Sequence, residues 1–259
     1  MFIRIEAHQY ARHARLIEGY LKLRKTVFAD ELEWDVACTG DLERDAYDDC
    51  DPVYLLWTDE ARTKVYAGLR LMPTTGPTLL HDVFSRTFGP DVDLVDPSVW
   101  ECTRLCVDHD LLLADLQTAP RRAMMLMIAF AHEVAHDVGI TTLVSNYEPQ
   151  HKRLYERAGV EFEEIGRADG YGRRPVCCGL FDVSREAIAN MRATLEIGRL
   201  QPENASQRTR ERPSCVPGHR KAEASTASPF TAAAALDRSI VPSMVPQFDD
   251  GSSRAAWAT

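Results

Sequence analysis

The stretch that decides the fold covers residues 99–145, VWECTRLCVDHDLLLADLQTAPRRAMMLMIAFAHEVAHDVGITTLVS. Its first nine residues, 99–107, are mainly apolar and predict a strand. Apolar residues then recur at helical spacing over about 119–138, and Gly139 ends the predicted helix. A second strand is expected at 141–145. Strands that alternate with helices indicate an α/β sheet.

The flanking sequence extends this alternation in both directions. Towards the N-terminus we expect a helix over 8–27, a long acidic loop over 26–51, strands at 53–57 and 65–71 joined by a polar turn, and a short helix over 81–88. Towards the C-terminus we expect a helix over 149–158, strands at 162–165 and 176–181, and a last helix capped by Ser184. The fold class is therefore α/β, with a single mixed β-sheet flanked by helices.

The composition changes near residue 198. Residues 198–259 are rich in Pro, Ser, Ala and Arg, and their large apolar residues are scattered. Such a segment cannot bury enough apolar surface to offset its ordering entropy. We therefore expect one folded domain over residues 1–197 and a disordered tail over 198–259.

Charge and hydropathy exclude several classes of partner. The 259 residues contain 30 Lys and Arg against 39 Asp and Glu, a net charge of −9, which argues against nucleic acid as the main partner. The longest mainly apolar run, 123–131, is about half of what a bilayer crossing needs, and the N-terminus has no segment of signal-peptide length. A cytoplasmic location is therefore expected, with the seven cysteines reduced.

One motif is typical of a metal site. In HEVAH, His132 and His136 would share one face of the predicted helix, and Glu133 could act as the general base of a zinc peptidase. The longer form of this motif requires a third histidine where Thr142 stands. The same three residues also fit the polar stripe of an amphipathic helix. We therefore expect no metal and keep the zinc metallopeptidase as an alternative.

Charged residues inside apolar strands are the second candidate. Glu101 and Arg104 interrupt VWECTRLCV, on opposite faces if the strand keeps a period of two, and Arg70 lies near the end of VYAGLRL. Charges in such strands are costly unless they are paired or functional. Four further ionisable residues precede them in the chain: Arg24, Glu43, Asp45 and Asp48.

These residues occur in motifs that resemble the LuxI-type acyl-homoserine-lactone synthases, the autoinducer synthases of quorum sensing. The matching pieces, in order, are LRKTVF with Arg24 and Phe28, then Trp34, ERDAYD with Glu43, Asp45 and Asp48, GLRLMPT with Arg70, the short helix with Phe84, and SVWECTRLCVD with Glu101 and Arg104. The resemblance covers roughly residues 1–195. One departure is Leu105, where many members have phenylalanine.

The resemblance implies an acetyltransferase-like (GNAT-type) three-layer sandwich with a V-shaped opening between central strands. It also implies an acyltransferase with two substrates, S-adenosylmethionine and an acyl thioester on acyl carrier protein or coenzyme A, and no separate cofactor. A related N-acetyltransferase that uses acetyl-coenzyme A is the nearest alternative. The glycine-rich pyrophosphate loop typical of those enzymes is absent before the long helix.

The residue types suit this chemistry. S-adenosylmethionine carries a sulfonium, an ammonium and a carboxylate, so carboxylates, a cation and aromatic faces would bind it. A carboxyl group in an apolar strand has a raised pKa, which suits a general base that frees the amine. The expected catalytic residues are Glu101 as the base, Arg70 and Asp45. The expected S-adenosylmethionine contacts are Arg24, Phe28, Trp34, Asp45, Asp48 and Arg104. Glu43 and Phe84 are expected to support the site.

Overall fold

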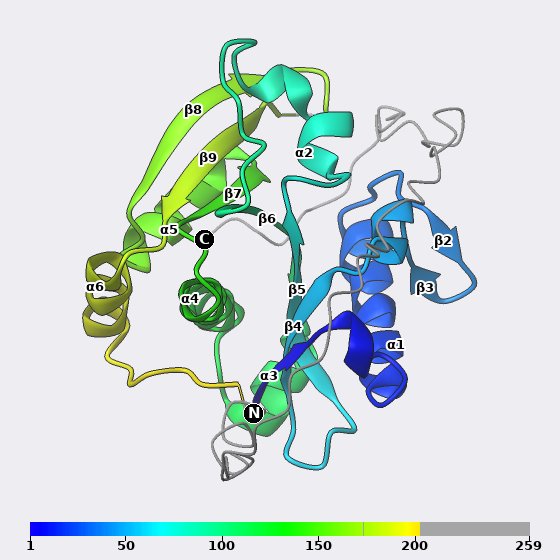
Figure 1. Cartoon of the computed structure of the whole chain (residues 1–259). Helices are drawn as coiled ribbons and strands as arrows, with labels where there is room; N and C mark the ends of the chain where they lie inside the picture. The colour runs from blue at the N-terminus through cyan, green and yellow to red at the C-terminus, as the bar shows by residue number, and fades with distance from the viewer. Residues whose placement is uncertain (173, 203–259) are drawn as a thin grey trace, which may run out of the picture.

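A seven-stranded sheet forms the centre of the molecule (Figure 1). The computed structural model describes residues 1–172 and 174–202, so the expected tail lies, from residue 203 onward, outside the described residues. The strand order is β1 (Phe2–Ile5), β4 (Val53–Thr58), β5 (Val65–Pro73), β6 (Val99–Val107), β7 (Thr142–Tyr147), β9 (Val176–Asp182) and β8 (Phe162–Ala168). All neighbours are antiparallel except β6 and β7, which are parallel. The mixed sheet predicted from the sequence is thus confirmed.

Helices cover both faces of the sheet and complete three layers, as the acetyltransferase-like arrangement requires (Figure 1). One face packs on α4 (Pro120–Asp137), and the same core includes residues of α3 (His109–Leu116), α5 (Lys152–Arg157) and α6 (Arg185–Leu195). The other face packs on α1 (Ala14–Arg24) and the π-helical turn η2 (Lys25–Glu31) that continues it. Alternate residues of β4 serve the two cores, with Leu55 towards α4 and Tyr54 and Leu56 towards α1.

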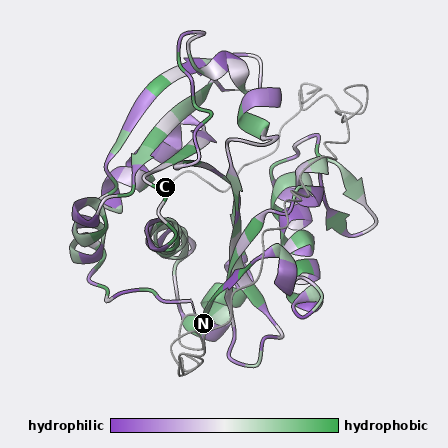
Figure 2. Cartoon of the chain, viewed as in Figure 1, coloured by the Kyte–Doolittle hydropathy of each residue, from purple (hydrophilic) through white to green (hydrophobic). Residues whose placement is uncertain are grey.

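The smaller elements lie around this sandwich. They are α2 (Leu79–Asp82), the two-stranded sheet β2 (Cys38–Thr39) with β3 (Leu42–Glu43), and the 3-10 turns η1 (Ala7–Gln9), η3 (Ala46–Asp49), η4 (Ser85–Thr87) and η5 (Pro149–His151). Helix α2 inserts Leu80 into a separate core with Val144 and Cys178. Figure 2 shows hydrophobic and hydrophilic residues along both α4 and α6, as expected of helices with one buried side. Among the described helices, none has the length and apolar character needed to cross a bilayer.

The opening expected between central strands appears in the strand pairing. Strands β6 and β7 pair only from Val99 with Thr142 to Glu101 with Val144, although both strands continue further. Beyond this point the Ser145 hydroxyl donates a hydrogen bond to the carbonyl oxygen of Cys102 at 2.8 Å. The sheet therefore splits directly after Glu101.

Several expected element boundaries were wrong. The helix expected over 8–27 begins only at Ala14, and the loop expected over 26–51 contains η2, the β2–β3 hairpin and η3. Strand β1 and helix α3 were not predicted. FIRI is too short for its alternation to distinguish a strand from coil. For α3 a signal was present, because the Asp108 side chain caps the helix by accepting a hydrogen bond from the Leu111 N–H.

Candidate active site

Arg104 lies at a β-bulge that redirects its side chain. Gly68 of β5 pairs with Cys106 and Arg70 pairs with Thr103, so two residues of β6 stand opposite one residue of β5. Arg104 takes a left-handed conformation with φ of +56°, and the Tyr20 hydroxyl donates a hydrogen bond to its carbonyl oxygen at 2.8 Å. The expectation that Glu101 and Arg104 lie on opposite faces was wrong, because the bulge breaks the period of two.

The bulge brings Arg104 into a network of three arginines and three carboxylates. Each cation comes from a different element, α1, β5 or β6, whereas the carboxylates all come from the short segment 43–48, which runs from β3 into η3. The members are Arg24, Arg70, Arg104, Glu43, Asp45 and Asp48. Equal numbers of opposite charges make the network formally neutral, which allows it to be buried.

Asp48 accepts five hydrogen bonds within the network and from its neighbours. Arg24 donates to both of its oxygens, at 2.8 and 2.9 Å, and Arg70 donates to Oδ1 at 3.0 Å. The hydroxyl of Tyr54 also donates to Oδ1, at 2.8 Å, and the main-chain N–H of Asp45 donates to Oδ2 at 2.9 Å. Burial alone would raise the pKa of Asp48, but the nearby arginines outweigh burial and hold that pKa well below its usual range.

Glu43 and Asp45 complete the network at different depths. Glu43 is fully buried, where it bonds to the Arg24 Nε and accepts a hydrogen bond from the Arg104 Nε at 3.2 Å. Asp45 accepts from Arg70 at 2.6 and 3.1 Å and from Arg104 at 2.8 Å. Its side chain is 11% exposed, against 5% or less for the other five members. Asp45 is thus the carboxylate of the network most open to a ligand.

Glu101 lies beside this network. One carboxylate oxygen, Oε1, accepts a hydrogen bond from the main-chain N–H of Leu80 at 2.6 Å. The other, Oε2, is buried and has no hydrogen-bond partner among the described residues. Burial raises the pKa of Glu101 from 4.5 to about 7. Arg70, the main-chain N–H groups of Leu80 and Leu79, and Arg104 act in the opposite direction and favour the charged form. A carboxyl group with this pKa and a free oxygen can accept a proton near neutral pH.

The predicted aromatic residues form part of the same region. Phe28 and Trp34 stack with ring centroids 5.2 Å apart, and the Arg104 guanidinium lies 5.5 Å from the centre of the Phe28 ring. Trp34 is 37% exposed, so its ring remains accessible. Phe84 packs in a small core with Tyr47, at the edge of the network rather than inside it.

Sequence reasoning missed the hydroxyl groups that support the network. The Tyr20 hydroxyl donates a hydrogen bond to the Arg104 carbonyl oxygen, and the Tyr54 hydroxyl donates one to Asp48. Thr103 accepts a hydrogen bond from the Arg70 Nε at 3.2 Å. The period of two places Tyr54 on one face of its strand, but only the pairing of Tyr54 with Arg70 shows that this face carries the network. The sequence contains no separate signal for that register.

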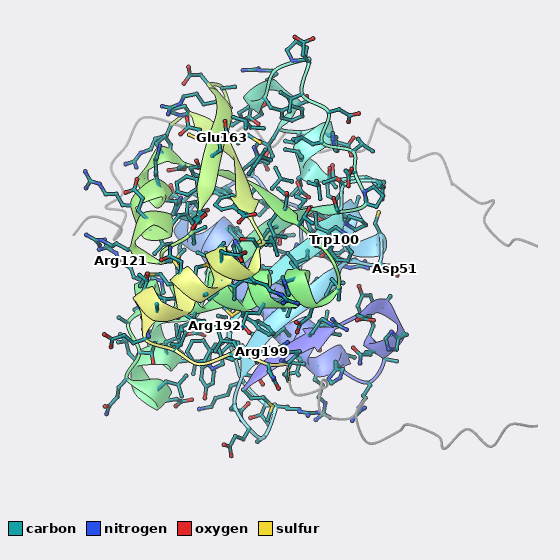
Figure 3. The ribbon with its side chains drawn as sticks, turned by 60° about the vertical axis from the view of Figure 1, so that its left-hand side comes forward. Asp51, Trp100, Arg121, Glu163, Arg192 and Arg199 are labelled. Carbon is teal, nitrogen blue, oxygen red and sulfur yellow. The ribbon has the colours of Figure 1, made fainter. Side chains whose placement is uncertain are left out.

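Two residues of the HEVAH motif have other contacts in the structure. His132 is buried, where its Nδ1 contacts the Ile128 carbonyl oxygen at 2.8 Å. Glu133 pairs with Arg192 at 2.9 Å and lies 3.8 Å from Arg199, both of which are labelled close together in Figure 3. No group of three His, Cys, Asp or Glu side chains within residues 1–172 and 174–202 could hold a metal ion.

A cavity of about 460 Å³ lies away from the network. Its wall includes Val53, Leu71, Trp100 and Val134, with Asp51 at its rim; Figure 3 labels Trp100 and Asp51 near the end of α4. Leu71 belongs to the core that packs on α4, whereas Arg70 faces the opposite way along β5. We therefore assign the candidate site to the ion network and Glu101, and not to this cavity.

The comparisons with known proteins bear on the family of the chain. The sequence pattern of autoinducer synthases matches residues 8–191. An acyl-homoserine-lactone synthase of Rhizobium etli is 32% identical over 186 residues, which cover 70% of this chain and 84% of that protein. One from Agrobacterium fabrum is 30% identical over 185 residues, with 71% and 87% covered.

Solved structures extend the likeness to the fold. TofI, in a ternary complex with an inhibitor and MTA, superimposes with a TM-score of 0.60 at 26% identity, covering 76% of this chain and 97% of that one. BjaI, a CoA-dependent acyl-homoserine lactone synthase solved with SAM and isopentyl-CoA, gives a TM-score of 0.68 at 24% identity, with 77% and 90% covered.

Proposed function

The chain belongs to the autoinducer synthase family, and from this premise we propose how its residues divide the work of an acyl-homoserine-lactone synthase. The enzyme is an acyltransferase whose substrates are S-adenosylmethionine and an acyl thioester. The amine of S-adenosylmethionine attacks the thioester carbonyl and displaces the thiol. The methionine carboxylate then attacks its own γ-carbon, which closes the lactone and expels methylthioadenosine. The second step is intramolecular and depends mainly on how the substrate is folded.

Asp45, Arg104 and the aromatic pair are the proposed contacts for S-adenosylmethionine. Asp45 is the most exposed carboxylate of the network and would face the ammonium or sulfonium group. Arg104 would pair with the substrate carboxylate, and Phe28 with Trp34 would cover the adenosyl side. All of these groups are held in position before the substrate arrives, which lowers the entropic cost of binding.

Arg24, Glu43 and Asp48 are proposed to have a mainly supporting role. Each is buried and has its charge paired within the network, so direct contact with substrate is not needed to explain it. Arg70 connects the proposed substrate contacts with the supporting residues, because it donates hydrogen bonds to both Asp45 and Asp48. Its charge also favours the ionised form of Glu101, which is the form that can act as a base.

Glu101 is the proposed general base, and the observation that carries this proposal is its buried Oε2, which has no hydrogen-bond partner in the described part of the chain. Replacement by glutamine keeps the size and the hydrogen bond from Leu80 but removes proton acceptance. We expect Glu101→Gln to lower turnover by roughly 10² to 10⁴ with little change in affinity for S-adenosylmethionine. Turnover by release of methylthioadenosine and affinity by calorimetry would test this. Normal turnover in the variant would reject Glu101 as the base.

The acyl donor is an acyl carrier protein or acyl-coenzyme A, since either thioester fits the family. We also propose that the enzyme works in the cytoplasm, where both substrates are made.

The domain boundary is proposed to lie slightly beyond the expected residue 197. Leu200 packs against the main core, and Arg199 pairs with Asp137 at 2.6 Å. A chain of residues 1–202 should therefore fold and retain synthase activity, as measured by circular dichroism and lactone formation. Loss of folded protein on this truncation would contradict the proposed boundary.

A further inference from the structure

Helix α2 holds Glu101 through its first turn. The first N–H groups of any helix lack partners within the helix, and here the N–H of Leu80 donates to Glu101 Oε1 at 2.6 Å. Leu80 and Glu101 are both fully buried, so water does not compete for this contact. The bond occupies Oε1 and leaves Oε2 without a partner among the described residues.

Thr78 fixes the start of this helix. It is the fully buried N-cap residue, with extended backbone angles, and its hydroxyl oxygen accepts a hydrogen bond from the His81 N–H at 3.4 Å. The same oxygen lies 2.8 Å from His81 Nδ1, and the Thr78 carbonyl accepts from the Asp82 N–H at 3.1 Å. At the other end of this four-residue helix, the N–H groups of Val83 and Phe84 donate to the Leu79 carbonyl oxygen, each at 2.9 Å.

A second contact joins α2 to the ion network. The Tyr47 hydroxyl donates a hydrogen bond to Asp82 Oδ2 at 3.1 Å. Tyr47 lies between Asp45 and Asp48 in sequence, and the Arg70 guanidinium is 5.7 Å from the centre of its ring. The helix that holds Glu101 is therefore tied to the turn that carries Asp45.

We propose that Thr78 is a positioning residue for the proton transfer, because its cap on α2 holds the Leu80 N–H against Glu101 Oε1 and so selects Oε2 as the proton acceptor. This inference rests on the proposed role of Glu101 as the base. Tyr47 assists Thr78 by tethering the other end of α2.

The predicted effect has a definite sign. A hydrogen bond donated to the charged form of a carboxyl group lowers its pKa, so loss of the Leu80 bond raises the pKa of Glu101. His81 of α2 contacts Thr78 itself. The ionisable groups that interact electrostatically with Glu101 are Arg70 of β5, Cys102 and Arg104 of β6, Tyr47 of η3 and Cys178 of β9. Substitution of Thr78 changes the charge of none of them.

The test compares two substitutions of nearly equal size. Thr78→Val removes the capping oxygen, and Thr78→Ser keeps it. In the full-length enzyme, the acid limb of the kcat/KM profile against pH should move up by roughly one pH unit in Thr78→Val and return to the parent position in Thr78→Ser. A purely structural role would lower the amount of active enzyme without moving the midpoint.

A second measurement does not depend on activity. With ¹³C-labelled glutamate, the Glu101 carboxyl resonance, assigned by its loss in Glu101→Gln, should titrate at higher pH in Thr78→Val than in the parent. Should Thr78→Val not fold, Tyr47→Phe removes the tether instead and should shift the midpoint in the same direction. An unchanged Glu101 titration in whichever variant folds overturns the proposal. Normal turnover of Glu101→Gln would instead reject the base assignment and leave the titration result to stand alone.

Discussion

Arg104 Nη2 lies 2.8 Å from Asp45 Oδ2, and this contact depends on the left-handed backbone of Arg104. An arginine in this conformation is uncommon, and such residues persist only where the surroundings hold them. The Tyr20 hydroxyl, which bonds to the Arg104 carbonyl, supplies part of that restraint. The ion network is therefore built by a distortion of β6 and not by the regular strand.

Substitution of Gly68 tests whether the ion network depends on this distortion of β6. A Cβ atom at Gly68 would lie 2.4 Å from Cδ2 of Tyr20, whose ring is fully buried and fixed by its hydrogen bond. Gly68→Ala should therefore displace Tyr20, cost about 1 to 3 kcal/mol of stability, and weaken binding of S-adenosylmethionine because Arg104 moves. Gly179→Ala is the control, since its Cβ would crowd Tyr147 at 2.8 Å, outside the network. Equal loss of binding in both variants would contradict the account.

Asp45 and Asp48 should respond differently to loss of charge. Asp45→Asn should mainly weaken binding of S-adenosylmethionine, by about 1.5 to 3 kcal/mol for a charged hydrogen bond. Asp48→Asn should instead lower the free energy of unfolding by about 3 to 5 kcal/mol, because it leaves Arg24 buried and partly unpaired. Calorimetry and urea unfolding separate the two effects. Asp49→Asn, at an exposed neighbour, should change neither, and a reversed pattern would invalidate the division into contact and support.

The contrast between sequence and structure is clearest in β6. Its bounds and its unusual charges were predictable, because apolar residues define the strand and Glu101 and Arg104 interrupt it. The bulge was not predictable, because it arises from register with β5 and from the Tyr20 contact 84 residues away. Likewise the sequence motifs named all six network residues, but which of them is exposed depends on three-dimensional packing.

Glu101 also predicts an unusual dependence of stability on pH. Its pKa is raised from 4.5 to about 7 by burial, so the folded state holds the proton more tightly than the unfolded chain does. Protonation of Glu101 therefore stabilises the folded state. This contribution is complete below pH 4.5 and is lost as the pH rises through 7. The free energy of unfolding of Glu101→Gln, relative to that of the parent, should increase by about 2 to 3 kcal/mol between pH 5 and pH 8. Urea unfolding at both pH values measures this.

The control for that measurement is Glu163→Gln. Glu163, labelled in Figure 3, is exposed on the edge strand β8, which β7 and β9 separate from β6. The free energy of unfolding of Glu163→Gln, relative to that of the parent, should not change with pH between pH 5 and pH 8. A pH-independent difference for Glu101→Gln would show that the carboxyl group is not protonated in the folded enzyme near neutral pH.

The surroundings of the α4 histidines predict that removal of metal ions does not change synthase activity. Burial lowers the pKa of His132, and Glu133 is already paired with Arg192. Treatment with a chelator should leave synthesis unchanged, and His136→Ala, at a partly exposed position, should keep most of the activity. Metal analysis should find far less than one zinc ion per chain. Stoichiometric zinc with activity lost on chelation would restore the peptidase alternative.

The central claim is that the homoserine lactone ring comes from S-adenosylmethionine by acyl transfer and ring closure. The most direct measurement is mass spectrometry of a reaction that contains the purified protein, an acyl thioester and S-adenosylmethionine labelled with ¹³C in the four carbons of its aminobutyryl group. We predict an N-acyl-homoserine lactone heavier by four mass units, together with an equal amount of unlabelled methylthioadenosine. An acylated amine without methylthioadenosine, or an unlabelled lactone, would contradict this account.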